Sequence, residues 1–485
     1  MTPPDRPSRT HPFRYGAGAA FLLAYFIYFN WGSLNVHFAI DDLGNMAHYY
    51  RGGWRLLLIS QFRIWHGDYR PMGGLFYVPI FHFAGLNPVP YQAVLLVLLL
   101  ANVYWVYRFA RLLGAGELAA ALAALAVCYH AGLANLYYNA AFVYDVLCCF
   151  FYLAAFVYYM RIRNSGRLLG TRQTLIFMAL FLCALNSKEM AVTIPVMLAV
   201  YEWIYHRPKG WNRAELLAWL RGPARVALFA AGLNLIDIYG KLFGPDPLTA
   251  GEGYRPVFAI GRVRAFQRLS YQDLFMNWDS APGWGGLLAA WVLMAYLAWR
   301  RADRPALRFL FWFLVVAPLP IEFLVGKSQA CLALLMIGLA VYVAIVLVDL
   351  ANAIARLLCG EPLFRLLGSR VLAGLLIAWV VYYWAHENRH LQTHIVRNSM
   401  ASLGEDSWDI IQQLRALDPH ARPGSRVAFL DDPFHSFDMH NIAELWIHDR
   451  SVDVHVMRDG PLTPEELARR DQVFTFENRK LIRLR

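Results

Sequence analysis

Residues 15–46 read YGAGAAFLLAYFIYFNWGSLNVHFAIDDLGNM, and they place two adjacent carboxylates, Asp41 and Asp42, just beyond the first long apolar stretch, Tyr15 to Val36. That stretch has the roughly 20 residues that a helix needs to cross a hydrocarbon layer of about 30 Å. It is too long for a cleavable signal peptide, and no small-residue cleavage site precedes the acidic pair. The segment therefore predicts a membrane span that delivers two acidic side chains to the membrane surface.

The composition of the whole chain indicates many such spans. Of its 485 residues, 58% are hydrophobic and 16% are charged, and the mean hydropathy is +0.37, outside the usual range of soluble proteins. We expect eleven membrane-spanning helices, of which the fifth and sixth are short. They cover residues 15–36, 90–110, 117–137, 141–160, 172–187, 190–205, 224–243, 284–300, 307–325, 330–350 and 370–385. The predicted fold class is an all-α polytopic membrane protein.

The basic residues of the loops predict the orientation of the chain, because cytoplasmic loops carry an excess of Lys and Arg. With the N-terminus (Arg6, Arg9 and Arg14) in the cytoplasm, 21 basic residues lie inside and 11 outside before residue 385. An odd number of spans then places the acidic pair and the C-terminus on the extracytoplasmic side. We expect an integral, multi-pass protein, in the inner membrane of a bacterium or in the endoplasmic reticulum of a eukaryote.

The net charge of +11 does not call for a nucleic-acid partner, because most of the excess belongs to this cytoplasmic rim. Anionic lipid headgroups are the expected partner of such a rim. The six cysteines all fall in proposed spans or inside loops, so none is placed for an external disulfide or a metal-binding pair. They are Cys128, Cys148, Cys149, Cys183, Cys331 and Cys359.

Two outside loops are longer than a connector requires. Residues 37–89 contain two apolar segments, 52–65 and 73–86, that are too short to span and are interrupted by Gly or Pro. We predict that they form helices lying in the membrane interface. Residues 244–283 are rich in Gly, Pro and basic side chains, which is typical of a mobile lid.

From residue 386 the composition becomes polar, so we divide the chain into a membrane domain, 1–385, and a small extracytoplasmic domain, 386–485. The tail has the pattern of an α/β unit. SWDIIQQLRAL has helical spacing, RVAFLDD and VDVHVM resemble strands, TPEELARR carries a capping pattern, and VFTFENRKLIRL suggests a closing hairpin.

Placing an ionisable side chain at the edge of a membrane costs free energy, so such residues often have a functional or structural role. Two neighbouring carboxylates can act as general base and orienting group, although Asp42 could instead cap a following helix. Lys188 could reach a lipid phosphate, or pair with Glu189 and extend to the interface. Asp145 could bind a basic residue of another loop or only begin a helix. Arg70, in DYRPM, is the fourth such site.

At these residues the chain resembles a known family. Five segments occur in an order that resembles that of the GT-C glycosyltransferases. They are the acidic pair, YRPMGGLFYVPIFHFAGL, YDVLCCFFYLAAFVYYMR, LNSKEMAVTIPVMLAVYEW and VVAPLPIEFLVGKSQACLALLMIGLA. The branch it resembles is that of the protein O-mannosyltransferase-related membrane proteins, including the TMTC group and its bacterial relatives without helical repeats. The resemblance covers roughly residues 15–350.

The resemblance implies an inverting glycosyltransferase that moves a monosaccharide from a polyprenyl-phosphate donor to an acceptor hydroxyl of a protein, lipid or glycan. Asp41 or Asp42 matches the acidic motif that serves as base, and we favour Asp41 as the base with Asp42 orienting the acceptor. Lys188 and Glu189 match the SKE motif, and Arg70 matches the RP element of the first loop. Charge for the leaving phosphate could come from Lys188 and from basic residues of the second long loop. Those residues are Arg255, Arg262, Arg264 and Arg268.

Some members of the family bind a divalent metal ion with acidic residues and a histidine of a later loop. This chain has no histidine between His206 and His386, and its tail histidines are irregularly spaced, so we expect metal-independent transfer. Two other classes stay open. One is a transporter or flippase of lipid-linked sugar, although such carriers usually place ionisable groups near the midplane of matching halves. The other is an inactive membrane scaffold.

Overall fold

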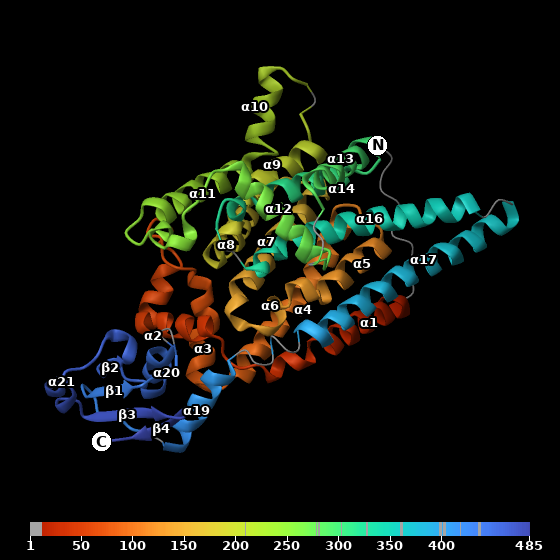
Figure 1. Cartoon of the computed structure of the whole chain (residues 1–485). Helices are drawn as coiled ribbons and strands as arrows, with labels where there is room; N and C mark the ends of the chain where they lie inside the picture. Colours follow the sequence, from red (N-terminus) through yellow and green to blue (C-terminus); the bar gives the residue numbers. More distant parts are fainter. Residues whose placement is uncertain are drawn as a thin grey trace.

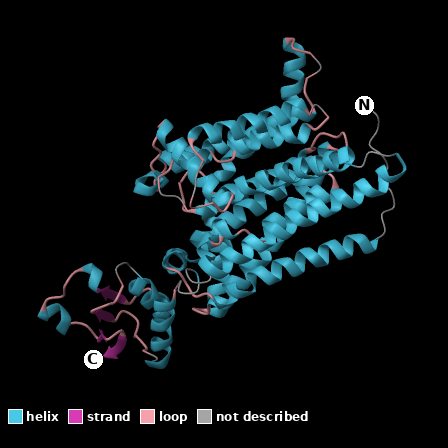
Figure 2. Ribbon diagram, turned by 45° about the vertical axis from the view of Figure 1, so that its right-hand side comes forward, coloured by secondary structure: helices cyan, strands magenta, loops and turns pink. Residues whose placement is uncertain are grey.

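The computed structural model describes residues 12–208, 210–277, 279, 282–301, 303–325, 328–358, 362–396, 400, 404–417, 419–434 and 438–485. Arg6, Arg9 and Cys359, named above, lie outside these ranges, and so does His435, one of the tail histidines. A bundle of long helices makes up most of the molecule, and a small unit with a β-sheet lies at one end of it (Figures 1 and 2).

Seven helical stretches in the described part of the chain are long and apolar enough to cross a membrane. Helices suit a bilayer because they satisfy their backbone hydrogen bonds internally. The helices concerned are α1 (Pro12–Asn30), α4 (Pro88–Leu112), α7 (Val143–Arg163), α11 (Arg225–Phe243), α14 (Pro305–Val316) with the short α15 (Leu319–Glu322), α16 (Ala333–Leu358) and α17 (Pro362–Leu391). The chain is an integral, multi-pass membrane protein.

Helices form in all eleven regions where spans are expected, but four of these helices are shorter than a span. They are α5 (Glu117–Cys128), α8 (Thr171–Ser187), α9 (Ile194–Tyr205) and α13 (Trp284–Arg300). The break between α8 and α9 has a local cause: Lys188 is extended, with φ −163° and ψ 150°, and the 3₁₀ turn η4 (Glu189–Thr193) follows it. This break brings two charged side chains into the interior.

Short 3₁₀ turns and small helices connect the long helices. They are η1 (Trp31–Asn35), η2 (Ala131–Leu133), α6 (Asn135–Tyr138), η3 (Ala140–Phe142), α10 (Arg213–Arg221) and η7 (Gln329–Leu332). A short π-helical turn, η8 (Gln392–Val396), follows α17, which itself continues past residue 385. Helix α10 projects away from the bundle (Figure 1).

The first long loop folds into two helices, as the sequence predicts. Helix α2 (Ile40–Ser60) bends at Gly53, which has φ 66°, and α3 (Pro71–Ala84) follows after a ten-residue connection. Helix α3 packs on α2, α7 and α8. It comes very close to α7, since a Cβ atom added at Gly73 would lie 2.0 Å from the ring of Tyr144.

The second long loop contains two 3₁₀ turns and a helix. The turns are η5 (Leu248–Ala250) and η6 (Glu252–Tyr254), and the helix is α12 (Ile260–Leu274). The loop runs back along the first one, where the backbone N–H of Asp246 donates to the carbonyl of His66 at 3.2 Å. The two long loops therefore meet at one end of the bundle.

The tail is an α/β unit with a four-stranded sheet in the order β2-β1-β3-β4. Strand β1 (Arg426–Leu430) pairs in parallel with β2 (Asp453–Val456) and β3 (Gln472–Glu477), and β3 pairs antiparallel with β4 (Lys480–Arg483). Helices α19 (Glu405–Leu417), α20 (Asp438–Ile447) and α21 (Pro464–Ala468) and the turn η9 (Met457–Asp459) complete it. The helix, strands, hairpin and Thr463–Glu466 capping box expected from the sequence are all present.

The α/β unit packs on the first loop, because α20 contacts α2 (Figure 1). Arg51 of α2 donates from Nε to both carboxylate oxygens of Glu444, at 2.9 and 2.8 Å. The ring of His448 stacks on Phe81 of α3, with centroids 5.3 Å apart. The α/β unit therefore contacts both helices of the first loop, α2 and α3.

The close approach of α3 to α7 makes a testable prediction. Replacing Gly73 with Ala forces the Tyr144 ring to move, and overpacking of this kind costs about 1–3 kcal/mol. The matched control is Gly232→Ala in α11, where nothing lies within 4 Å of the added Cβ and alanine favours the helix. Unfolding of the two variants in detergent should show a loss of stability for Gly73→Ala alone. Equal stabilities would contradict the close packing.

Candidate active site

Arg70 lies at the centre of the candidate site. It precedes Pro71 at the start of α3 and has a left-handed backbone, φ 40° and ψ 62°, which is uncommon for a residue other than glycine. The hydroxyl of Tyr49 donates to its carbonyl at 2.9 Å. Its side chain is buried, with 7% exposed. A strained backbone and a buried charge together indicate a position fixed for function.

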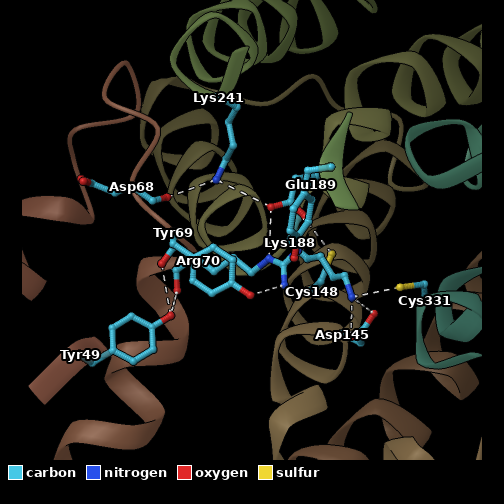
Figure 3. A network of polar contacts seen from close by, with 11 residues as sticks. Tyr49, Asp68, Tyr69, Arg70, Asp145, Cys148, Lys188, Glu189, Lys241 and Cys331 are labelled. Atoms are coloured by element: carbon cyan, nitrogen blue, oxygen red, sulfur yellow. Dashed lines mark hydrogen bonds and ion pairs between the residues drawn. The ribbon is translucent and has the colours of Figure 1, made fainter. Parts of the chain in front are cut away.

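The guanidinium of Arg70 binds Glu189 in two places. Nε donates to Oε1 at 3.2 Å and Nη2 donates to Oε2 at 2.9 Å. Two tyrosine hydroxyls also accept from it, Tyr69 at 2.9 Å and Tyr254 at 3.2 Å. Planar pairing of this kind fixes both charge and orientation. The pair joins the first loop to the break between α8 and α9 (Figure 3). Tyr254 joins both to the second loop.

Glu189 also faces a second cation. Nζ of Lys241, from α11, lies 3.9 Å from Oε1 of Glu189 and donates to the backbone carbonyl of Asp68 at 3.4 Å. Burial opposes ionisation of Glu189, but Arg70 and Lys241 outweigh it and lower the pKa of this carboxyl to about 2. The carboxylate is therefore ionised at neutral pH and holds two cations in place.

Lys188 points away from this cluster. Its ammonium donates to both oxygens of Asp145, at 2.5 and 2.6 Å, and lies 3.3 Å from Sγ of Cys331. Although burial acts against the charged form, Asp145 raises the pKa of Lys188 above its ordinary value. Of the two alternatives for Asp145, the structure has the ion pair. The two residues of the SKE segment thus face different partners (Figure 3).

A cavity of about 1020 Å³ lies between α2, the connection to α3 and the start of the second loop. Tyr69 and Tyr254, which hold the guanidinium of Arg70, are part of its wall. Its charged and titratable lining residues come from both loops. They are His48, Arg51, Arg63, His66, Asp68 and Asp246. The cavity wall thus combines a mainly apolar surface with charged groups of both signs, and the buried Arg70 lies next to it.

The acidic pair lies at the start of α2, outside the lining of this cavity. Asp42 is buried; its carboxylate accepts from the backbone N–H of Ala39 at 3.0 Å and from the hydroxyl of Tyr77 at 3.0 Å. It therefore caps α2, which was one of the two alternatives. Burial raises its pKa to about 7 against these two hydrogen bonds, and the charge of Asp41 adds to the rise. Asp41 is exposed.

A group of tyrosines connects Asp42 with Arg70. The hydroxyl of Tyr77 donates a hydrogen bond to Asp42, and the ring of Tyr77 stacks with that of Tyr49, with centroids 6.2 Å apart. The hydroxyl of Tyr49 lies 3.1 Å from that of Tyr144, whose ring faces the Arg70 guanidinium at 5.3 Å. The acidic pair and the buried arginine are thus connected through packed tyrosines of α2, α3 and α7.

None of the four basic residues predicted from the second loop lines the cavity, and the positions of Arg255 and Arg264 show why. Arg255 is exposed and donates to the carbonyl of Thr249 at 3.3 Å. Arg264 lies over the ring of Trp284, 5.1 Å from its centroid. Neither lines the cavity. The loop instead contributes Asp246 and Tyr254, which the sequence did not single out.

Three comparisons with known proteins bear on the fold. No protein-family model and no curated protein matches the chain. Among solved structures, apo ArnT from Cupriavidus metallidurans superposes with a TM-score of 0.53 and 13% identity, over 96% of this chain and 94% of ArnT. ArnT from the same organism bound to undecaprenyl phosphate superposes with a TM-score of 0.52 and 13% identity, over 92% of this chain and 86% of ArnT.

The Archaeoglobus fulgidus oligosaccharyltransferase, tethered to an acceptor peptide, gives a TM-score of 0.52 at 12% identity. The alignment covers 92% of this chain, which spans 64% of the length of that enzyme. The chain shares the GT-C fold. This agrees with the superfamily that the acidic pair, the RP element and the SKE segment resemble, while identities this low show the fold alone.

The buried pair of Arg70 and Glu189 predicts an asymmetric response to mutation. Glu189→Gln leaves the guanidinium buried without its carboxylate, which costs about 3–5 kcal/mol. Replacing both residues with apolar ones, Arg70→Met with Glu189→Leu, should recover most of that loss. Asp406→Asn, which removes an exposed ion pair with Arg479, is the control and should change stability by less than about 1 kcal/mol. Denaturant unfolding measures all three, and equal effects of Glu189→Gln and Asp406→Asn would contradict the pairing.

The raised pKa of Asp42 predicts a pH dependence of stability. The unfolded chain releases this proton near pH 4 and the folded chain near pH 7, so stability falls as the pH rises between these values. The loss amounts to a few kcal/mol, at about 1.4 kcal/mol for each pKa unit.

Asp42→Asn should remove most of this slope, because the amide stays neutral and can still accept from Ala39. Asp41→Asn, on the neighbouring exposed carboxylate, should keep it. Thermal unfolding in detergent from pH 4.5 to 8 measures the difference, and a wild-type midpoint that does not fall over this range would contradict the assignment.

Proposed function

We propose that the chain is an inverting glycosyltransferase that moves a monosaccharide from a polyprenyl-phosphate donor to an acceptor hydroxyl on the extracytoplasmic face of the membrane. The observation that carries the proposal is the cavity beside the buried Arg70, at the end of the bundle where both long loops meet. The orientation predicted from the loop charges places this end outside the cytoplasm. ArnT, which shares the fold, binds undecaprenyl phosphate.

The chemistry of such a donor fits the charges of the site. When the bond between the anomeric carbon and the phosphate oxygen breaks, the lipid phosphate leaves as an anion and needs cations rather than a proton donor. Arg70 and Lys241 supply that charge from next to the cavity, and Arg63 lies in its lining. Both oxygens of Glu189 hold the cations in the resting state, so binding of a phosphate competes with this carboxylate.

Lys188, which the sequence suggests as a cation for the leaving phosphate, has a structural role in this proposal. Because its ammonium is buried against Asp145, it stabilises the break between α8 and α9 and thereby positions Glu189. The donor phosphate then meets Arg70, whose hydroxyl partners Tyr69 and Tyr254 face the cavity. Tyr254 also ties the second loop to the arginine, which supports a lid that excludes water from the sugar.

The acceptor hydroxyl attacks the anomeric carbon from the side opposite the phosphate, which inverts the configuration. We assign the proton to Asp41, the exposed member of the acidic pair, while the buried Asp42 fixes the start of α2. One base suffices, because the leaving group departs as an anion. The resemblance to the O-mannosyltransferase-related proteins supports a monosaccharide rather than an oligosaccharide as the group transferred.

The test is a transfer assay with purified protein, a panel of polyprenyl-phosphate monosaccharides and a mixture of peptide, lipid and glycan acceptors. Arg70→Met should reduce sugar release by at least 100-fold through loss of charge at the leaving phosphate, and Asp41→Asn should reduce it by 10²–10⁴-fold through loss of the base. Arg55→Gln, on an exposed arginine of α2 outside the cavity lining, is the control and should keep the wild-type rate.

Two results would overturn the proposal. One is a folded wild-type protein that releases sugar from none of the donors. The other is movement of an intact lipid-linked sugar across proteoliposome membranes without release, which indicates a carrier. Full activity of Asp41→Asn would move the base to another carboxylate and leave the transferase in place.

A further inference from the structure

Three side chains from the two long loops converge at the edge of the cavity. His66 and Asp68 belong to the connection between α2 and α3, and Asp246 lies just after α11. One ligand atom from each lies within 4.8 Å of the other two. Nδ1 of His66 is 3.0 Å from Oδ1 of Asp68 and 3.5 Å from Oδ2 of Asp246.

The two distances from His66 are compatible with ligands that share one metal ion. Bonds from Zn²⁺ to imidazole nitrogen or carboxylate oxygen are about 2.1 Å long, so neighbouring ligand atoms lie about 3.0 Å apart in octahedral and about 3.4 Å apart in tetrahedral geometry. The two distances from His66 fall close to these values. Asp246 is 73% exposed and can adjust its position.

Nδ1 of the His66 imidazole faces a carboxylate oxygen of Asp68 and one of Asp246. Nδ1 is shielded from solvent and makes no hydrogen bond of acceptable geometry, even though two carboxylates lie within 3.5 Å. Nδ1 thus contacts two carboxylate oxygens without a hydrogen bond of good geometry, which is the arrangement expected where a cation binds between the three groups. A cation bound by all three groups satisfies this nitrogen.

Asp68 is held in place by a neighbouring arginine. Nε of Arg63 donates to Oδ2 at 3.1 Å and Nη2 donates to Oδ1 at 2.8 Å. A carboxylate has about four lone-pair sites, so this pairing leaves one on each oxygen for a metal ion. Outer partners of this kind orient the ligands in known metal sites.

The backbone under the cluster is fixed by close glycine contacts. Gly67 has φ 90°, and a Cβ added there would lie 2.4 Å from the carbonyl of Asp246. A Cβ at Gly240 would lie 2.3 Å from the carbonyl of Ile64. The two loop segments therefore pack backbone against backbone, which sets the ligands before any ion binds.

We propose that His66, Asp68 and Asp246 bind a divalent transition metal ion, Zn²⁺ or Mn²⁺, at the edge of the cavity. Imidazole with two carboxylates suits these ions, and three protein ligands leave coordination positions open. All three residues line the cavity, so the open positions face it. The site stands on its own geometry, while its role as a further cation for the donor phosphate rests on the proposed function.

The site does not follow the pattern of the resembled family, in which the histidine comes from a later loop. Here the histidine is in the first loop, two residues before Asp68 and four before Arg70. The expectation of metal-independent transfer is based on the absence of a histidine in the later loop, and it does not consider His66.

Titration of metal into the purified, full-length protein tests the site. After removal of any affinity tag and treatment with EDTA, Zn²⁺ is followed by calorimetry and Mn²⁺ by electron paramagnetic resonance. We expect one ion per chain. His66→Ala and Asp246→Asn should each weaken the affinity at least tenfold, and saturating metal should raise the unfolding temperature of the wild type but not of these variants.

His82→Ala, on an exposed histidine of α3, is the matched control and should keep the wild-type affinity. Circular dichroism and cooperative unfolding establish that each variant is folded. Failure of the wild type to bind either ion, or unchanged affinity in both ligand variants, would overturn the site. Because no donor or acceptor is present, this outcome is independent of the transfer assay: an active enzyme that binds no metal keeps its function and loses the site.

Discussion

The buried contact between Arg70 and Glu189 determines how the rest of the site is arranged. A charged pair inside a membrane protein is costly unless each charge is fully bonded, and here the guanidinium has a bidentate carboxylate and two tyrosine hydroxyls. To form it, the span near residue 188 must break and α3 must begin at a left-handed residue. These two local irregularities of the fold bring Arg70 and Glu189 together.

The same contact links binding to loop position. Tyr254 comes from the second loop and shares the guanidinium with Glu189, while Lys241, at the end of the helix that precedes the loop, contacts the same carboxylate. A ligand that displaces the carboxylate changes the partners of both residues. Binding of an anion and closure of the loop are therefore parts of one equilibrium.

Much of the fold follows from sequence patterns, and the reasons are local. Apolar length predicts helices in each span region, and Thr463, Glu466 and the alternating strand residues predict the elements of the tail. The four short helices are less predictable, because apolar content alone does not show where a backbone breaks. The break at Lys188 depends on a partner, Asp145, that is 43 residues away.

The candidate site is predictable in its main residues but not in their pairing. The DYRPM and SKE segments identify Arg70, Lys188 and Glu189, yet only the packed structure shows that Lys188 faces Asp145 rather than the cavity. Lys241 comes from the last turn of α11, and Asp246 and Tyr254 come from the second loop; none of the three stands in a distinctive sequence pattern. The signal near His66 was available, since a histidine and an aspartate stand two apart beside the RP element.

The contact between α2 and α20 also sets an order of assembly during synthesis. Arg51 and Glu444 are 393 residues apart in the sequence. Because a ribosome adds about 5–20 residues per second, Glu444 is synthesised on the order of 20–80 seconds after Arg51. Arg70 meets Glu189 after only 119 residues. The contact between Arg70 and Glu189 can thus form early, whereas the contact between Arg51 and Glu444 forms only after residue 444 has been synthesised.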